Sequence, residues 1–102
     1  MTEFPFSDLH SFKDYVGFVQ VACPDEFPVR EGASQEEQWT LDLAFEGLRY
    51  GIDLIGKEKG KNPILADCLN LIQQAYEDYR ADKIRDGYSK LNEMRKLLRN
   101  LK

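Results

Sequence analysis

The sequence predicts an all-α fold, a small antiparallel bundle of three or four helices that forms one domain over residues 1–102. Apolar residues recur at intervals of three and four along several segments, which is the spacing of one face of a helix. Prolines and glycines separate these segments. The composition, with 42% hydrophobic and 31% charged residues in a chain of 102, is typical of one globular domain with its own core.

The first helix is expected to begin at Ser7 or Ser11 and to end near Ala22. Its apolar positions follow helical spacing, but the segment is also rich in β-branched and aromatic residues, which favour strands. A strand therefore remains an alternative for this segment. The apolar positions are Leu9, Phe12, Val16 and Val19.

Residues 24–33 are predicted to form a loop, because they contain Pro24, Pro28 and a glycine. Pro28 also restricts the residue before it to extended backbone. The apolar residues of the loop, Phe27 and Val29, are expected to pack against the bundle as anchors. Contact between Phe27 and a partner protein is the alternative.

The second helix is expected over about residues 35–56 and is interpreted as the central element of the fold. Ser34 followed by Glu37 matches a capping box, in which the serine accepts from the backbone N–H of Glu37 and the carboxylate reaches back. Gly56 fits the residue that ends a helix. The apolar arc between these ends is wide, which indicates contact with more than one neighbouring helix.

Two glycines within this helix need a compensating contact. Ala44, Gly47 and Gly51 lie at i, i+3 and i+7 and form a stripe with little side chain. Each glycine costs about 0.5–1 kcal/mol relative to alanine inside a helix. The stripe predicts the close approach of another helix backbone, and a groove for a ligand or for a helix of another protein is the alternative.

The third helix is predicted to begin at Pro63, with Asn62 as its N-cap. Beyond Tyr79, a turn between Ala81 and Asp86 is favoured over one long helix, because a helix of more than about 35 residues is rare in a small domain. The fourth helix then closes the bundle. The expected apolar faces are Leu65, Leu69, Ile72, Tyr76 and Tyr79 in the third helix and Met94, Leu97 and Leu98 in the fourth.

Charge is distributed unevenly along the chain. Residues 1–56 have a net charge of −8 and residues 57–102 a net charge of +4. The total of −4 argues against a nucleic-acid partner, since nucleic-acid-binding domains carry a positive excess. Seven acids and one base lie between Asp25 and Glu46, so this stretch is the best candidate for meeting a basic protein surface. The predicted partner-binding residues are Glu36, Glu37, Asp42, Glu46 and Phe27.

The chain offers few residues for catalysis. His10 is the only histidine, and the sequence contains no phosphate-binding loop, dinucleotide fingerprint or histidine-based zinc motif. Cys23 and Cys68 are expected to be buried free thiols, with a disulfide or a reactive thiol as the alternative. We therefore expect no catalytic residue, no metal and no cofactor. Acids four residues apart are expected at a solvated face or turn rather than on a divalent cation; they are Asp42–Glu46 and Asp78, Asp82 and Asp86.

These features predict a non-enzymatic protein-interaction domain that binds a partner with a basic surface through an acidic face. Immunity proteins and antitoxins are analogues at the level of class. A metal-dependent hydrolase that uses carboxylates of the second and third helices and a homodimeric structural or adaptor protein are the alternatives. The chain lacks the stretch of about twenty apolar residues that a membrane span requires and lacks a secretory signal, so a cytoplasmic protein without membrane contact is expected.

Overall fold

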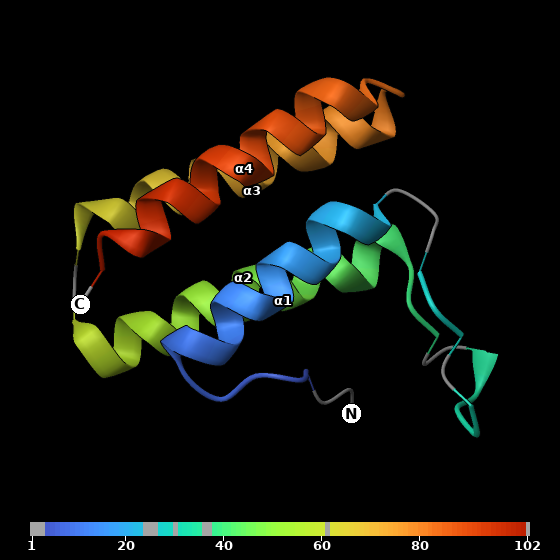
Figure 1. Cartoon of the computed structure of the whole chain (residues 1–102), viewed down its shortest axis with the longest axis horizontal. Helices are drawn as coiled ribbons and strands as arrows, with labels where there is room; N and C mark the ends of the chain where they lie inside the picture. The colour runs from blue at the N-terminus through green and yellow to red at the C-terminus, as the bar shows by residue number, and fades with distance from the viewer. Residues whose placement is uncertain (1–3, 24–26, 30, 36–37, 61, 102) are drawn as a thin grey trace.

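The computed structural model describes residues 4–23, 27–29, 31–35, 38–60 and 62–101 and confirms the all-α bundle. Four helices follow one another along the chain and alternate in direction (Figure 1). The first segment is helical, which excludes the strand alternative. The helices are α1 (Leu9–Ala22), α2 (Leu41–Lys59), α3 (Pro63–Arg80) and α4 (Ile84–Arg99).

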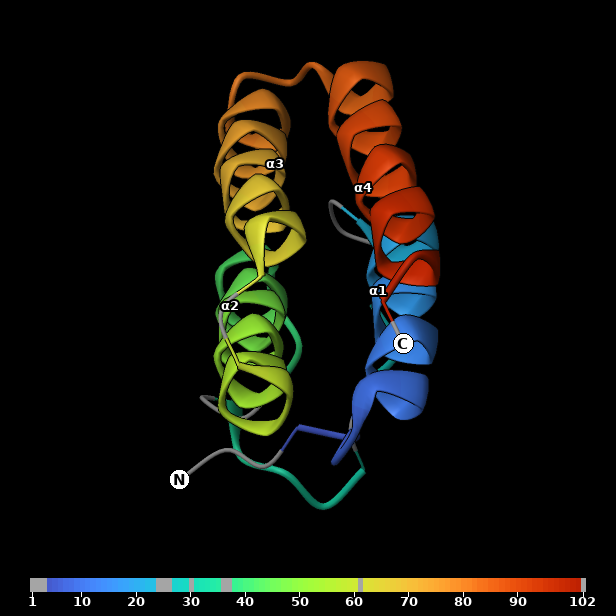
Figure 2. The ribbon, with the colours of Figure 1, turned by 90° about the vertical axis from the view of Figure 1, so that its left-hand side faces the viewer.

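The four helices close into a ring. α1 and α2 lie in one layer and α3 and α4 in the other, with α3 beside α2 and α4 beside α1 (Figures 1 and 2). α2 contacts α1 and α3, as its wide apolar arc predicts. Each of the other described helices also contacts two neighbours, so α2 is one of four comparable members rather than the central element.

The hydrophobic core lies between the two layers and takes side chains from every helix. Burying each large apolar side chain contributes about 1.5–3 kcal/mol, which is what holds the four amphipathic helices together. A polar contact also joins α1 to α4, where Arg95 Nη1 donates to Gln20 Oε1 at 2.9 Å. The largest fully buried side chains include Phe12, Val16, Phe45, Leu48, Ile55, Ile72, Leu91, Met94 and Leu98.

α1 begins at Leu9, between Ser7 and Ser11, the two starts considered from the sequence, and its N-cap is Asp8. The Asp8 carboxylate accepts from the backbone N–H of Ser11 at 2.8 Å, and Ser11 Oγ accepts from the backbone N–H of Asp8 at 3.2 Å. This reciprocal pair is a capping box, and it satisfies donors that the first helical turn leaves free. The hydrogen bond from the Ser11 backbone lowers the pKa of Asp8.

α2 begins later than predicted, because its N-cap is Thr40 rather than Ser34. Thr40 Oγ1 accepts from the backbone N–H of Leu43 at 3.1 Å. A threonine in this position satisfies a free donor as well as a serine does, so the local pattern alone could not distinguish the two starts. Glu36 and Glu37, the acids of the predicted capping box, lie outside the described residues.

α2 also ends later than predicted. The helix continues through Gly56 to Lys59, and Gly60 ends it with a φ of +82°, a backbone conformation that favours glycine. The start of α3 is confirmed, since the Asn62 side chain accepts from a backbone N–H of the first turn at 2.9 Å and Pro63 occupies the first helical position.

Aromatic side chains fill the glycine stripe of α2. A Cβ placed on Gly51 would lie 2.7 Å from Phe12 Cζ, and one placed on Gly47 would lie 2.8 Å from Tyr15 Cζ. The Tyr15 hydroxyl donates to the carbonyl oxygen of Ala44 at 2.9 Å and secures the ring there. The stripe therefore packs inward, as favoured, but rings from α1 occupy it instead of a helix backbone.

α3 and α4 form the predicted hairpin. The chain turns over residues 81–83, where Asp82 adopts a φ of +63°. Two predictions about apolar residues are wrong: Leu69 is 45% exposed and Val29 is 80% exposed. The buried stripe of α3 passes through Cys68 and Ala75 instead, which are also at helical spacing.

Candidate functional site

The exposed side of α2 carries the described part of the predicted acidic face. Asp42 and Glu46 are exposed and lie one helical turn apart, so the structure brings these two predicted residues together. Exposed charged residues continue along the same stripe at intervals of three and four, as Arg49, Asp53 and Lys57. We call these five residues the α2 stripe.

Asp42 takes part in a contact with two residues of α3. The Tyr76 hydroxyl donates to the Asp42 carboxylate, and Arg80 Nη1 donates to the same hydroxyl at 3.0 Å. The Arg80 nitrogen lies 4.0 Å from the carboxylate, with the two charged side chains 62% and 71% exposed. Ion pairs this exposed contribute only about 0–1 kcal/mol, so the Asp42 carboxylate stays accessible to another cation.

This pair is the one ion pair between the α1–α2 layer and the α3–α4 layer within the described residues. Glu46 has no ion-pair partner in that part of the chain. The remaining pairs are Lys57–Asp53 within α2 at 3.2 Å and Lys90–Asp78 across the hairpin at 2.7 Å. Among the described residues, acids of residues 1–56 pair with bases of residues 57–102 only at Asp42–Arg80 and Asp53–Lys57, and both pairs are exposed. Most of the charge difference between the two halves of the sequence is therefore not neutralised there by ion pairs.

The carboxylates that the hydrolase alternative needs have different partners. Asp42 contacts Tyr76 between α2 and α3, whereas Asp78 accepts from Lys90 between α3 and α4. No three His, Cys, Asp or Glu side chains come together in a group that could hold a metal ion, as far as the described residues show. The observed contacts of these acids are with hydroxyl and ammonium groups.

Phe27 faces the bundle. Its ring lies 6.1 Å from the Phe18 ring and 6.4 Å from the Trp39 ring, and the side chain is partly buried. The expectation that Phe27 anchors its loop is confirmed, and this packing does not favour the partner-contact alternative. Glu36 and Glu37, which follow in the same connection, lie outside the described residues.

The two cysteines are buried free thiols, which excludes the disulfide alternative. Burial raises the pKa of Cys23 to about 12 and that of Cys68 to about 12. Both thiols are therefore protonated near neutral pH, and a protonated thiol is a poor nucleophile. His10 is exposed near the start of α1.

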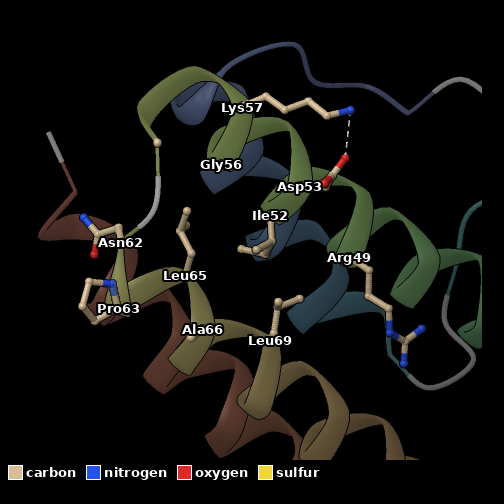
Figure 3. Close-up of a pocket in the computed structure, with 11 residues that line it drawn as sticks. Arg49, Ile52, Asp53, Gly56, Lys57, Asn62, Pro63, Leu65, Ala66 and Leu69 are labelled. Carbon is tan, nitrogen blue, oxygen red and sulfur yellow. Dashed lines mark ion pairs between the residues drawn. The ribbon is translucent and has the colours of Figure 1, made fainter.

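A groove opens between the second half of α2 and the first half of α3. Its volume is about 660 Å³, and eleven of the described residues line it. Ile52 from α2 and Leu65 and Leu69 from α3 point toward its centre (Figure 3). Charged residues of the α2 stripe lie along its edge.

The sequence reasoning missed this groove because it placed Leu69 in the core. Two sets of positions in α3 follow helical spacing, so periodicity alone does not show which set is buried: 65, 69, 72 and 76, or 65, 68, 72, 75 and 79. In the structure the second set is buried and Leu69 lies on the surface. The signal in the sequence that could have indicated a groove was Gly56, a residue without a side chain. It lies within α2 and lines the groove instead of ending the helix.

Within the described residues, no helix combines the length and the apolarity that crossing a bilayer requires. The chain matches no protein-family model, and no curated protein or solved structure is significantly similar to it.

Proposed function

We propose that this chain is a non-enzymatic protein-interaction domain that binds a partner with a basic surface through the α2 stripe. The observation that supports this is the exposure of Asp42 and Glu46 on adjacent turns, with Glu46 unpaired among the described residues. Two adjacent carboxylates of this kind attract a basic surface and orient it during the encounter.

The contact at Asp42 supports the replacement of Arg80 by an arginine of the partner protein. Arg80 is held at the edge of Asp42 by an exposed pair of 4.0 Å, which is weak in water. An arginine of the partner that makes two parallel hydrogen bonds to the carboxylate would form a stronger contact. The ring of Tyr76 lies beside this carboxylate, with the guanidinium groups of Arg49 at 5.5 Å and Arg80 at 5.7 Å from its centre, so an arginine of the partner would replace Arg80 both at the carboxylate and at the ring.

The proposal extends to an inhibitory role, in which the acidic side of the bundle covers a basic partner as immunity proteins and antitoxins do. The small size and net charge of −4 support this extension. The identity of the captured partner, a toxin or another basic protein, tests it.

The test compares two variants with the same change in net charge. Asp42→Asn with Glu46→Gln removes two of the three carboxylates of the α2 stripe, and Asp67→Asn with Glu93→Gln removes two exposed carboxylates elsewhere. The partner is isolated from the native host with the unaltered protein and identified. Its association rate with each protein is then measured at about 50 mM and about 300 mM salt, on either side of physiological screening.

We expect the α2 double variant to keep its helical circular dichroism and to associate about tenfold more slowly at low salt, because electrostatic steering is lost. The control variant should stay within about twofold of the unaltered protein, since its carboxylates lie away from the contact. Association rates that depend neither on the α2 substitutions nor on the salt concentration would show that the acidic face is not the binding surface.

A further inference from the structure

We propose that the groove between α2 and α3 is a binding site for a small anionic amphiphile, a molecule with an apolar chain and a single carboxylate such as a medium-chain fatty acid. The groove borders the α2 stripe, since Arg49, Asp53 and Lys57 line it, but the inference uses neither Asp42 nor Glu46 and does not depend on the basic partner.

The walls of the groove are apolar. Ile52, Leu65 and Leu69 point toward its centre, with Ala66 beside them on α3 (Figure 3). Ile52 and Leu65 are buried core residues, 3% and 7% exposed, whereas Leu69 and Ala66 are exposed to solvent. Leu69 is 45% exposed although it borders this apolar surface, so an apolar occupant would remove more of it from water. The volume of about 660 Å³ lies within the range of roughly 300–1,000 Å³ that is usual for small-molecule sites.

Gly56 keeps one wall of the groove open, and packing does not require it. A Cβ placed there would lie 3.7 Å from Leu65 Cδ1, which is an ordinary van der Waals contact. The glycine lies inside α2, where it is less favourable than almost any other residue. Gly47 and Gly51, in contrast, are required by the rings packed against them. Gly56 therefore leaves room beside Leu65 that a side chain at this position would fill, and this room adds to the space for an apolar ligand.

The charge at the end of the groove selects an anion. Lys57 is already paired with Asp53 at 3.2 Å. Arg49 has no carboxylate within ion-pairing distance among the described residues; its Nη2 donates to the neutral Gln73 Oε1 at 3.3 Å. The Tyr76 ring, 5.5 Å from the guanidinium carbon, helps to hold it in place. A carboxylate at this end would therefore find an unmatched and partly ordered cation.

The size of the groove argues against a protein as its main occupant. Eleven residues line it in the part of the chain that the structure describes, whereas a stable interface between two proteins uses about 20–30 residues on each side. A second copy of the chain seated here would need contacts well beyond the groove. A short apolar chain with one charged end matches both the dimensions and the charge of the site.

The test is a titration of the full chain with decanoate, below the concentration at which decanoate forms micelles, followed by nuclear magnetic resonance. We expect saturable shifts of the methyl signals of Ile52, Leu65 and Leu69. Decyltrimethylammonium has the same tail and the opposite charge. It should bind at least about tenfold more weakly than decanoate, since a favourable ionic contact is replaced by a repulsive one.

Three variants locate the site. Ala66→Leu places a larger side chain at an exposed position of the groove wall and should weaken decanoate binding by about tenfold or more, because it occupies the space of the tail. Arg49→Gln should weaken binding by about tenfold, the effect of losing one charge-assisted hydrogen bond. Arg85→Gln is the control for the loss of one arginine, since Arg85 is exposed on α4 and does not line the groove; it should bind decanoate as the unaltered protein does.

Several results would overturn the proposal. These are the absence of groove shifts, shifts of similar size at exposed apolar residues elsewhere such as Val21 and Ile84, or equal binding of the cationic amphiphile. Groove signals that move on dilution without any ligand would show that a second copy occupies the site. Signals that move only with the captured protein partner would assign the groove to that partner.

Discussion

Replacing Gly51 with alanine sets two effects of opposite sign against each other. In a helix without tertiary constraints, the substitution stabilises by about 0.5–1 kcal/mol. Here the new Cβ would overlap the ring of Phe12, a fully buried side chain: Cζ would lie 2.7 Å away and Cε1 and Cδ1 closer still, and a Cβ closer than 3.0 Å to another heavy atom forces a shift. Overpacking of a core costs about 1–3 kcal/mol. The two effects together leave a net loss of about 0–2.5 kcal/mol, and direct overlap with a buried ring places the expected loss at about 1–2.5 kcal/mol, which lowers Tm by roughly 4–8 °C per kcal/mol.

The matched control is Gly17→Ala in α1. A Cβ at that position would lie 3.7 Å from the Arg95 guanidinium carbon, an ordinary contact. Only the helix-propensity effect remains, so this variant should be more stable by about 0.5–1 kcal/mol. Urea unfolding, followed by far-ultraviolet circular dichroism and by the fluorescence of Trp39, measures the free energy of unfolding of both variants.

A third measurement links the loss to the ring. In a Phe12→Leu background the smaller side chain leaves room for the new methyl group, so the Gly51→Ala substitution should cost less there than in the unaltered protein. The reasoning is refuted if Gly51→Ala stabilises the protein as Gly17→Ala does, or if its cost is unchanged when Phe12 is leucine.

Four further predictions concern the helix ends and the core. Thr40→Ala should cost about 1 kcal/mol in urea unfolding because it removes the N-cap of α2; a larger loss from Ser34→Ala would place the helix start where the sequence pattern first put it. Asp82→Ala should cost about 1 kcal/mol, because alanine is strained at a φ of +63°; an increase in Tm would contradict this. Cys23 and Cys68 should react with a thiol reagent only when urea unfolds the chain, and rapid labelling of the folded protein at pH 8 would contradict their burial. Burial raises the pKa of each thiol from 9.0 to about 12 in the folded protein. The contribution of the two thiols to stability is therefore complete below pH 9 and is lost as the pH rises toward 12. The free energy of unfolding in urea at about pH 8, 10 and 11 measures this loss.

Local signals predicted those elements that depend on a few neighbouring residues. Asn62 and Pro63 predicted the start of α3 correctly, because an N-cap and a proline at the first position act through the adjacent turn alone. The start of α2 was predicted wrongly because Ser34 and Thr40 are both competent caps. At the end of α2, Gly56 and Gly60 competed in the same way, and the helix ends where the backbone takes a positive φ.

The candidate sites show the same division. Exposure of Asp42 and Glu46 could be predicted, since charged residues four apart on a helix share one surface. Their relation to Tyr76 and Arg80 could not, because it depends on which face of α3 lies against α2. The groove depends on the same rotation, which buries Cys68 and leaves Leu69 exposed.

The helical class, the hairpin and the separation of acidic from basic segments could be predicted from the chain alone, because periodicity, turn residues and charge order are local properties. Three features emerge only when the helices pack: the aromatic rings that fill the glycine stripe, the carboxylates that stay accessible, and the groove between two helices. These outcomes depend on how each helix is rotated about its own axis. That rotation is set by the simultaneous packing of all four helices, which no single segment encodes.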